Sequence, residues 1–572
     1  MAHVFLISSS HTSSLYHSVD ASSVRHLASF TPLIRALLKD GNSEKDVSRA
    51  TVVIIDTQSP SQTGDSLDSL SYEEKYVFLH YFFSHTNLIV VSSHAFADSA
   101  TVAQLDSAVR SVGSVIGTRI SRVAVWTGTS GFASDDAFAS ETLKQQFGMV
   151  VPTMTRVLYL TSNLSEVTEK MLKSLRLRLL QALDFKLILS QHSDKHLSKL
   201  CHCVGHWAFP AHELSNDDLV YCVYLMLDYA VKFVVANGAP SELVVPTSNK
   251  LLALAFMTRD TYKKGNQFHN FRHAVDVLQA CFFYLIRLKC LPVFEQYETD
   301  PKADETHIFN GKKSFMRYLT LVPIPEHPVT DSSSVPLLTP IQSLGLLVAA
   351  LGHDVGHPGV TNAFMIKHST PTSQIYNERS VLEMFHSSVF TNKILKIAWP
   401  SLLQCNISTD SNVNICQLIT SSILATDMAE HFEYIQKLKE MPEILRADEQ
   451  VKLMSSLLIK CADISNVTRP LRVSSLWALI LLREFEEVDK LEKIIRNEGT
   501  VELDVDYPQL PLTLGEILEA NPCIHKGQLF FINTFAEGLF NSVLDHFKEL
   551  KYTSDIIAEN KLFWQTHAEK LS

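Results

Sequence analysis

The feature that most constrains the fold is a change in hydrophobic periodicity near residue 185. From there to residue 572, apolar residues recur every three or four positions, the spacing of a helix with a buried face. The clearest stretches are DLVYCVYLMLDYAVKFVV, AVDVLQACFFYLIRL and SLLIKCADI. Strand-like alternation nearly disappears over the same range. Residues 191–572 are therefore predicted to form one large all-α domain.

Before this change the chain reads differently. Short β-branched runs are separated by segments of helical character, a pattern typical of a mainly parallel, doubly wound α/β sheet. The runs are His3–Ile7, Thr51–Asp56, Asn87–Ser92, Arg122–Thr127 and Arg156–Thr161. We therefore expect an α/β domain over residues 1–165 and a connecting helical segment over residues 166–190.

The expected sheet domain carries no recognisable chemistry. Ligands bind such sheets at the carboxyl ends of strands, so Asp56 and the glycines of TGTSGF are the candidates there. However, no GxGxxG or GxxxxGK[ST] motif is present, and the first strand ends in Ser8–Ser10. The layout resembles a receiver or flavodoxin-like domain without its functional residues. A regulatory or structural role follows, with a partner that the sequence does not identify.

Bulk composition excludes several classes of function. A net charge of −11 argues against nucleic-acid binding, which needs a basic face. Hydrophobic residues at 46% and charged residues at 19% favour folded globular domains. No stretch approaches about 18 uninterrupted apolar residues, and the start of the chain has no basic segment of a signal peptide. We expect a soluble cytoplasmic protein without a membrane span.

The cysteines and the longer loops add two further expectations. The nine cysteines are odd in number and lie mostly in apolar helical stretches, which favours reduced core thiols. Cys201-His202-Cys203 lacks the CxxC spacing of a closed zinc site, so a structural metal there is disfavoured. Residues 295–339 and 497–521 are polar and proline-bearing and are expected to be surface insertions. Thr339 and Pro340 are expected to start the next helix.

Three segments supply residue types that bind metals: HNFRH at 269–273, HDVGH at 353–357 and CADISN at 461–466. A lone histidine on an apolar helix is more often a hydrogen-bonded core residue than a ligand. Here each of the first two segments places two histidines at positions i and i+4, which share one face of a helix. Asp354 and Asp463 each follow a long apolar helix, where a buried carboxylate needs a partner. Together the segments predict a metal site.

The expected donors mix imidazole nitrogen with carboxylate oxygen. This combination suits a Zn²⁺ position beside a Mg²⁺ or Mn²⁺ position. Asp354 has two carboxylate oxygens and could bridge both ions. Two ions about 4 Å apart generate a bridging hydroxide and clamp phosphate oxygens, which is the arrangement for phosphoester hydrolysis.

These segments carry a resemblance to the HD phosphohydrolases, and more closely to the class I cyclic nucleotide phosphodiesterases. Signatures of that family include YHNxxHA, HDxxHPGxxN, YNxxSVLExxH, LATDM and HCADxSNPxxP. This chain has FHNFRHA at 268–274, HDVGHPGVTN at 353–362, YNERSVLE at 376–383, LATDM at 424–428 and CADISN at 461–466. It departs from the family pattern at Phe268 for Tyr, Gly356 for Asp, Val467 for Pro and Met384-Phe385 ahead of His386. None of these departures removes an expected metal ligand.

The resemblance covers roughly residues 185–570 and implies roles for particular residues. His273, His353, Asp354 and Asp463 become metal ligands, and His269 becomes the general acid that protonates the leaving O3′. His357, Glu383, Asn362 and Thr426 are expected around the metal-bound water. CIHKGQLFFIN is similar to the SQxGFID segment of the family, which implies contact with the base. The residues expected to contact the substrate are Gln528, Phe531, Asn466, Met428, Leu481 and Phe268.

The implied reaction is hydrolysis of 3′,5′-cyclic AMP to the 5′-monophosphate by a metal-bridged hydroxide. Asn466 is the residue that favours cyclic AMP over cyclic GMP, because family members with Asn there commonly act on cyclic AMP. An N-terminal α/β region without a nucleotide-sensing segment most resembles the fungal high-affinity enzymes. Two alternatives stay open: another HD-type nucleotide phosphohydrolase, and a non-catalytic sensor of cyclic nucleotides.

Overall fold

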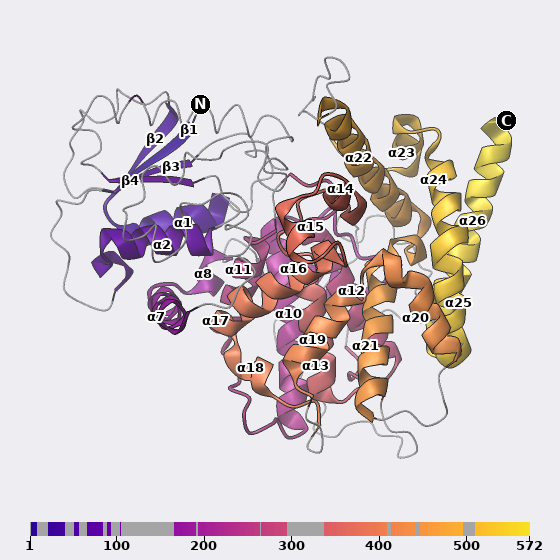
Figure 1. Ribbon diagram of the computed structural model, residues 1–572, viewed down its shortest axis with the longest axis horizontal. Coiled ribbons are helices and arrows are strands. Elements are labelled where there is room, and N and C mark those ends of the chain that lie inside the picture. Colours follow the sequence, from indigo (N-terminus) through magenta and orange to yellow (C-terminus); the bar gives the residue numbers. More distant parts are fainter. Residues whose placement is uncertain are drawn as a thin grey trace.

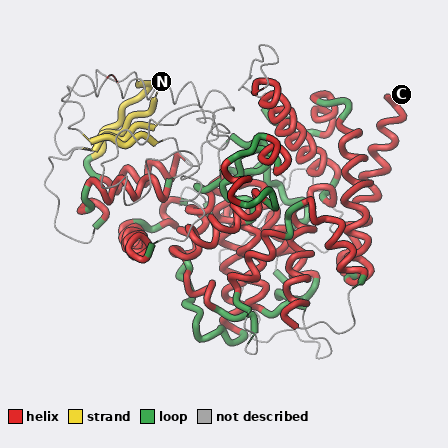
Figure 2. Tube along the Cα trace, in the orientation of Figure 1, coloured by secondary structure: helices red, strands yellow, loops and turns green. Residues whose placement is uncertain are grey.

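The computed structural model describes residues 2–7, 21–40, 51–55, 66–83, 88–92, 103, 165–189, 193–262, 265–294, 337–408, 413–440, 447–495 and 509–571. A small unit with a parallel sheet lies at the N-terminal end, beside a much larger helical body (Figures 1 and 2). The α/β domain followed by an all-helical domain, predicted from the periodicity, is confirmed.

The sheet contains four described strands in the order β2-β1-β3-β4, and every neighbouring pair is parallel. This is the order of the first four strands of a flavodoxin-like sheet. The strands are β1 (Ala2–Ile7), β2 (Ala21–Leu27), β3 (Thr51–Ile55) and β4 (Leu88–Ser92). Three of them confirm predicted runs. The runs at 122–127 and 156–161, Asp56 and the glycines of TGTSGF lie outside the described residues.

Strand β2 was missed from the sequence. Its residues, ASSVRHL, include only one valine and no alternating apolar face. It is a strand because it pairs along β1, where Val24 lies opposite Val4. Pairing and packing, rather than intrinsic preference, decide such a segment.

Two helices lie along one face of the sheet, α1 (Phe30–Asp40) and α2 (Tyr72–Phe82), between the strands and α7 (Figure 1). Hydrogen bonds join this unit to the helical body. The buried guanidinium of Arg259 donates to the carbonyl of Leu38 at the end of α1, with a distance of 3.0 Å. The Tyr81 hydroxyl of α2 donates to the carbonyl of Lys393. The sheet domain is therefore docked on the helices through buried polar contacts.

The helical body is built from helices of very different lengths. The α-helices are α7 (Glu166–Ala182), α8 (Phe185–Ile188), α9 (Asp194–Gly205), α10 (Asn216–Ala236), α11 (Ser248–Arg259), α12 (Phe271–Arg287), α13 (Pro340–Gly352), α14 (Asn362–Lys367), α15 (Pro371–Ile375), α16 (Val381–Val389), α17 (Lys396–Ala398), α18 (Pro400–Gln404), α19 (Ile415–Leu424), α20 (His431–Lys439), α21 (Ala447–Asp463), α22 (Leu471–Ile495), α23 (Leu514–Ala520), α24 (Ile524–Phe531), α25 (Glu537–His546) and α26 (Lys551–Leu571). Short 3₁₀ segments are η2 (Leu67–Ser69), η6 (Met428–Glu430), η7 (Ser465–Thr468) and η9 (Lys548–Leu550), and π-helical turns are η5 (Phe390–Leu395) and η8 (Ile532–Ala536).

The centre of the body is a bundle of apolar helices in which α10, α12, α13, α19 and α21 pack on one another. Among the described residues, α10 alone is long and apolar enough to pass a length-and-composition test for a membrane span. It lies inside the bundle, with 72% of its most apolar window buried, as expected of a core helix. Helix α13 starts as predicted, with Thr339 and Gln342 forming a reciprocal cap and Pro340 in the first turn.

One loop prediction is wrong in part. The expected insertion at 497–521 contains the short helix α23, whose N-terminus is capped by Thr513 and Glu516. The capping pair TLGE was the sequence signal for it. Residues 496–508, and residues 295–336 of the other expected insertion, lie outside the described part of the chain.

Candidate metal centre

The first metal-binding segment straddles the start of α12. The side chain of Asn270 caps this helix by accepting the backbone N–H groups of Arg272 and His273, at 2.9 and 3.3 Å. His273 therefore lies in the first turn, whereas His269 lies before the cap. The prediction that both histidines share one helical face is wrong, because α12 begins only after Asn270, which lies between them.

The second segment is a turn rather than a helix. Helix α13 ends at Gly352, His353 is its C-cap, and Gly356 adopts a φ of +74°. This left-handed conformation favours glycine and cannot continue a helix. The predicted i, i+4 face for His353 and His357 is therefore also wrong. The turn instead directs both rings toward the start of α12.

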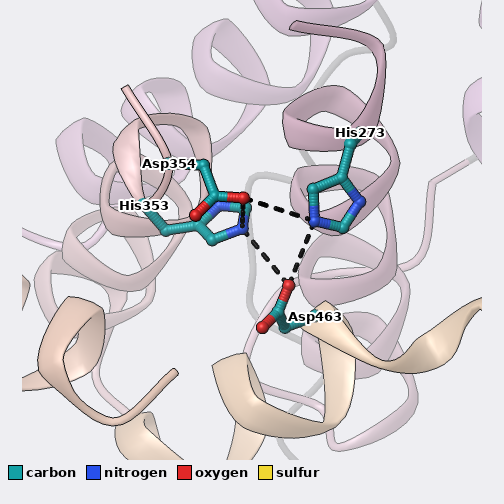
Figure 3. A group of neighbouring side chains, drawn as sticks. All are labelled: His273, His353, Asp354 and Asp463. Atoms are coloured by element: carbon teal, nitrogen blue, oxygen red, sulfur yellow. Dashed lines mark hydrogen bonds and ion pairs between the residues drawn. The ribbon is translucent and has the colours of Figure 1, made fainter. Parts of the chain in front are cut away.

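The four expected ligands nevertheless converge. His273, His353, Asp354 and Asp463 each offer one donor atom within 4.8 Å of the others (Figure 3). The Nε2 atom of His273 lies 3.1 Å from Asp463 Oδ1 and 3.6 Å from Asp354 Oδ2. Asp463 is the last residue of α21, so three segments far apart in the chain meet here. The four side chains predicted to bind metal therefore lie close together in the fold.

The hydrogen bonding of His353 directs one of its ring nitrogens into this cluster. Its Nδ1–H donates to the Ala350 carbonyl at 2.9 Å, since a carbonyl can only accept. In the neutral ring Nε2 then carries a lone pair, and this buried atom makes no hydrogen bond within the described part of the chain. It faces Asp354 Oδ2 at 3.2 Å and Asp463 Oδ1 at 3.3 Å. A lone pair directed at two carboxylates fits a cation between them, as in ligand histidines whose other nitrogen donates to a carbonyl.

The ionisation of the group points to the same need for positive charge. Burial acts to raise the pKa of Asp463, but the facing imidazoles of His273 and His353 outweigh it and hold the pKa well below its usual value. Burial acts to lower the pKa of His353, but Asp354 and Asp463 raise it well above the ordinary value, so a proton on Nε2 and a metal ion compete for the place between the two carboxylates. The carboxylates thus stay charged and attract any cation available, which suits divalent metal ions.

His269 is held by a carboxylate that the sequence did not indicate. Its Nδ1 is hydrogen-bonded to Glu484 Oε1, and Glu484 Oε2 accepts the backbone N–H groups of Phe268 and His269, at 2.8 and 3.2 Å. Burial acts to lower the pKa of His269, but Glu484 outweighs it and raises that pKa to about 9. The ring is therefore fixed in orientation and holds a proton at neutral pH.

Two further histidines complete the buried cluster. The ring of His357 stacks on His269 with centroids 4.0 Å apart, and its Nδ1 accepts the N–H of Gly359 at 3.0 Å. Burial and the charge of His269 keep the pKa of His357 well below its ordinary value. His386, which was not among the predicted site residues, lies with Nε2 3.7 Å from Asp354 Oδ1. The cluster thus contains the four histidines of the first two metal-binding segments together with His386.

Asn362 and Glu383 form a hydrogen-bonded pair of an amide and a carboxylate. The amide of Asn362 donates to both oxygens of Glu383, at 3.2 and 2.9 Å. Burial and the neighbouring Asp427 nevertheless raise the pKa of Glu383 to about 8. Thr426 precedes Asp427 and donates its hydroxyl to the Ile423 carbonyl. The structure thus brings Asn362 and Glu383 together.

Tyr262 supports the turn that carries two of the ligands. Its buried hydroxyl donates to the Leu351 carbonyl at 2.9 Å and accepts the Asp354 N–H at 3.3 Å. The backbone of Asp354 is thereby fixed from outside its own turn. No local motif marks this tyrosine in the sequence, although its position shortly before HNFRH offers a weak signal.

The residues expected to contact substrate lie on several elements. Gln528 and Phe531 belong to α24, which packs on α22, the helix that carries Leu481 and Glu484. Gln528 is buried, and its Oε1 accepts no hydrogen bond from the described residues. Met428 is the first residue of η6. Asn466 is buried in η7, a short distance along the chain after Asp463.

Phe268 has a clear packing role. Its ring lies 4.6 Å from that of His273 and 5.4 Å from that of Trp477, measured between centroids. It is buried between them and helps to hold His273 in place. Its predicted contact with substrate stays a prediction.

The cysteine-histidine segment at 201–206 forms no metal group. The three groups of potential ligands found among the described residues do not include it. Cys201 and Cys203 are buried thiols whose pKa burial raises. This burial fits the prediction that these cysteines are reduced thiols in the core.

Comparison with known proteins decides the family. A family model described as 3′5′-cyclic nucleotide phosphodiesterase matches residues 306–557. The crystal structure of yeast caPDE2 is 45% identical, covers 99% of this chain and 100% of its own, and superposes with a TM-score of 0.83; its complex with IBMX gives 0.84. The chain belongs to the class I cyclic nucleotide phosphodiesterases. The family predicted from the five sequence boxes is confirmed.

Curated relatives of the phosphodiesterase agree with this assignment. The 3′,5′-cyclic-nucleotide phosphodiesterase 2 of Saccharomyces cerevisiae is 32% identical over 68% of this chain and 65% of its own length. The phosphodiesterase regA of Dictyostelium discoideum is 27% identical over 64% of this chain and 38% of its own length. The chain thus spans less than two-thirds of the length of these relatives.

Proposed function

We propose that this phosphodiesterase hydrolyses 3′,5′-cyclic AMP to 5′-AMP and prefers it to cyclic GMP. The observation that carries the proposal is the convergence of two histidines and two aspartates, with the buried Nε2 of His353 facing both carboxylates, beside a histidine held by Glu484. The donor set fits Zn²⁺ beside Mg²⁺ or Mn²⁺. His273, His353, Asp354 and Asp463 would hold the ions. Bound ions would supply the nucleophile and neutralise the phosphate.

The protein side chains would supply the remaining steps. His269 would protonate the leaving O3′, since the Glu484 carboxylate keeps its ring charged and aligned. His357 would exclude water from one face of that ring by stacking on it. Glu383, Asn362 and Thr426 would order water near the ligands.

The base would lie between Phe531 and Leu481, with Gln528 hydrogen-bonding its edge. The buried, unpaired Oε1 of Gln528 supports this proposal, because such an oxygen needs a donor. A glutamine amide can rotate to suit either purine, so the preference for cyclic AMP rests on Asn466. The relatives do not decide between the substrates, since the mouse high affinity cAMP-specific phosphodiesterase 8A is 27% identical and the cGMP-specific phosphodiesterase 3 of Dictyostelium discoideum is 26% identical. A cytoplasmic location stays a prediction from the sequence.

The test is a direct assay of the purified full-length chain. Cyclic AMP and cyclic GMP are supplied separately, with Mg²⁺ or Mn²⁺ and after chelation, and the 5′-monophosphates are quantified. The proposal expects metal-dependent release of 5′-AMP with a higher kcat/KM than for cyclic GMP. Binding of cyclic AMP without hydrolysis would support the sensor alternative instead. Hydrolysis of other nucleotides alone would support the wider HD class.

A further inference from the structure

Lys460 is a buried charge whose role the proposed chemistry leaves open. It lies on α21 one helical turn before Asp463, and its side chain is 1% exposed. The Nζ atom donates to the carbonyl of Ala425 at 2.9 Å and to that of Asp427 at 3.0 Å. Burial of an ammonium costs free energy unless it is hydrogen-bonded, so these two hydrogen bonds are what allows Lys460 to lie in the core. The family box HCADxSNPxxP has histidine at this position.

The segment that Lys460 holds, residues 425–428, lies between several site residues. Thr426 is flanked by the two carbonyls that accept from Lys460. The Asp427 carboxylate accepts the Ala429 N–H at 2.9 Å and the Ser380 hydroxyl at 2.8 Å. Ser380 is a non-glycine residue with a φ of +39°, a strained conformation directly before α16. The segment is thereby tied to the helix that carries Glu383.

Acidic side chains and one aromatic ring surround Lys460. Burial lowers the pKa of Lys460, and Asp463, Asp427 and Glu383 act against that lowering. The Tyr434 ring lies 5.6 Å from Nζ, in the range of a cation–π contact. The side chain therefore faces acidic groups from three different segments.

Lysine can do here what histidine cannot. An ammonium offers three donors on a flexible stem, so it can bond two carbonyls at once while facing carboxylates. A neutral imidazole offers one N–H. A neutral histidine at this position could therefore not replace both contacts of Lys460 to residues 425–428.

We propose that Lys460 is a positioning residue that fixes residues 425–428 and, through Asp427 and Ser380, the start of α16. Thr426, Met428 and Glu383, three residues that we assign to the site, then keep their places. This inference rests on the proposed function for its effect on turnover, but not for its effect on local structure.

The test compares Lys460→Met and Lys460→His with Lys393→Met, which removes another buried lysine, located on η5. Hydrogen exchange of a peptide covering residues 420–430 reports the contact directly. In both Lys460 variants we expect exchange in this peptide to rise about tenfold or more, as expected when hydrogen bonds to a charged donor are lost. The kcat for cyclic AMP should fall about tenfold, while zinc content stays that of wild type because all four ligands remain. Lys393→Met should change none of these three readouts.

Wild-type exchange at 420–430 in Lys460→His would overturn the proposal, and this variant decides the matter if Lys460→Met does not fold. Faster exchange with unchanged kcat and KM would also overturn it, because the segment would then not position the site. A wild-type protein that does not hydrolyse cyclic AMP would refute the proposed function, whereas faster local exchange in the variants would still support the contact.

Discussion

At the scale of single residues, the site separates the side chains that we propose as metal ligands from the histidine that we propose as the proton donor. His273 Nε2 faces both aspartates, whereas His269 is bonded to Glu484 and stacked on His357. The two histidines are close in the chain but have different partners. Substitution of His269 and substitution of His273 should therefore have different effects.

We predict that His269→Ala keeps its zinc and loses about 10²- to 10⁴-fold in kcat, the usual contribution of a general acid. His273→Ala should lose zinc as well as activity, because it removes a ligand. Metal analysis of both purified variants, alongside steady-state kinetics, makes the comparison. Equal zinc loss in both variants would mean that His269 is itself a ligand.

The Glu484 carboxylate gives a prediction for pH dependence. It raises the pKa of His269 to about 9 against burial, which acts in the opposite direction. In Glu484→Gln the burial should prevail, so the pKa of His269 falls and the ring loses its proton at lower pH. The alkaline limb of the kcat profile should therefore move to lower pH, with a lower kcat at pH 8. Glu486→Gln, a change on the same helix, serves as the control, and an unmoved alkaline limb in Glu484→Gln would contradict the acid role of His269.

At the scale of elements, the ligands are placed by where helices end. Asn270 starts α12 just before His273, Gly352 ends α13 just before His353, and Asp463 ends α21. The site therefore depends on how closely these helix ends approach their neighbours. Gly352 marks the tightest of these contacts, against Phe390 of η5.

We predict that Gly352→Ala destabilises the fold by about 1–3 kcal/mol through overpacking. A Cβ at this position would lie 2.3 Å from atoms of the Phe390 ring. The gain in helix propensity, about 1 kcal/mol, does not offset such a clash. Gly527→Ala in α24 is the matched control, because its Cβ would meet nothing within 4 Å. Thermal or denaturant unfolding of both variants measures the difference, and equal stability would show that Phe390 moves aside freely.

At the scale of the whole molecule, the sheet domain and the helical body share one continuous apolar core. Arg259 is bonded to Leu38 of the sheet domain and, in its own body, to Asp260 and Asp217. Tyr262, which supports Asp354, follows it closely in the chain. Removal of the sheet domain would thus uncover both apolar surface and a buried guanidinium.

We predict that a chain lacking residues 1–165 has a lower unfolding temperature and aggregates, because it loses this cover. Every candidate ligand lies after residue 267, so the monomeric fraction should still hydrolyse cyclic AMP with a kcat within about threefold of the full chain, a change of less than 1 kcal/mol in barrier. Light scattering, zinc analysis and kinetics on the monomer peak test this. A folded, zinc-loaded and inactive monomer would place an essential group in the sheet domain.

The sequence by itself predicted the all-helical domain, three of the four described strands and the four candidate metal ligands that the fold brings together. These follow from local periodicity, from capping pairs such as Thr339 with Gln342, and from residue types that divalent ions bind. Only the tertiary structure decided that His269 and His357 lie outside helices and stack on each other. It also decided that Glu484, 215 residues away in the sequence, holds His269. The physical reason is that a hydrogen bond or a close ring contact depends on distance in space, and local sequence patterns carry no information about which distant side chain arrives there.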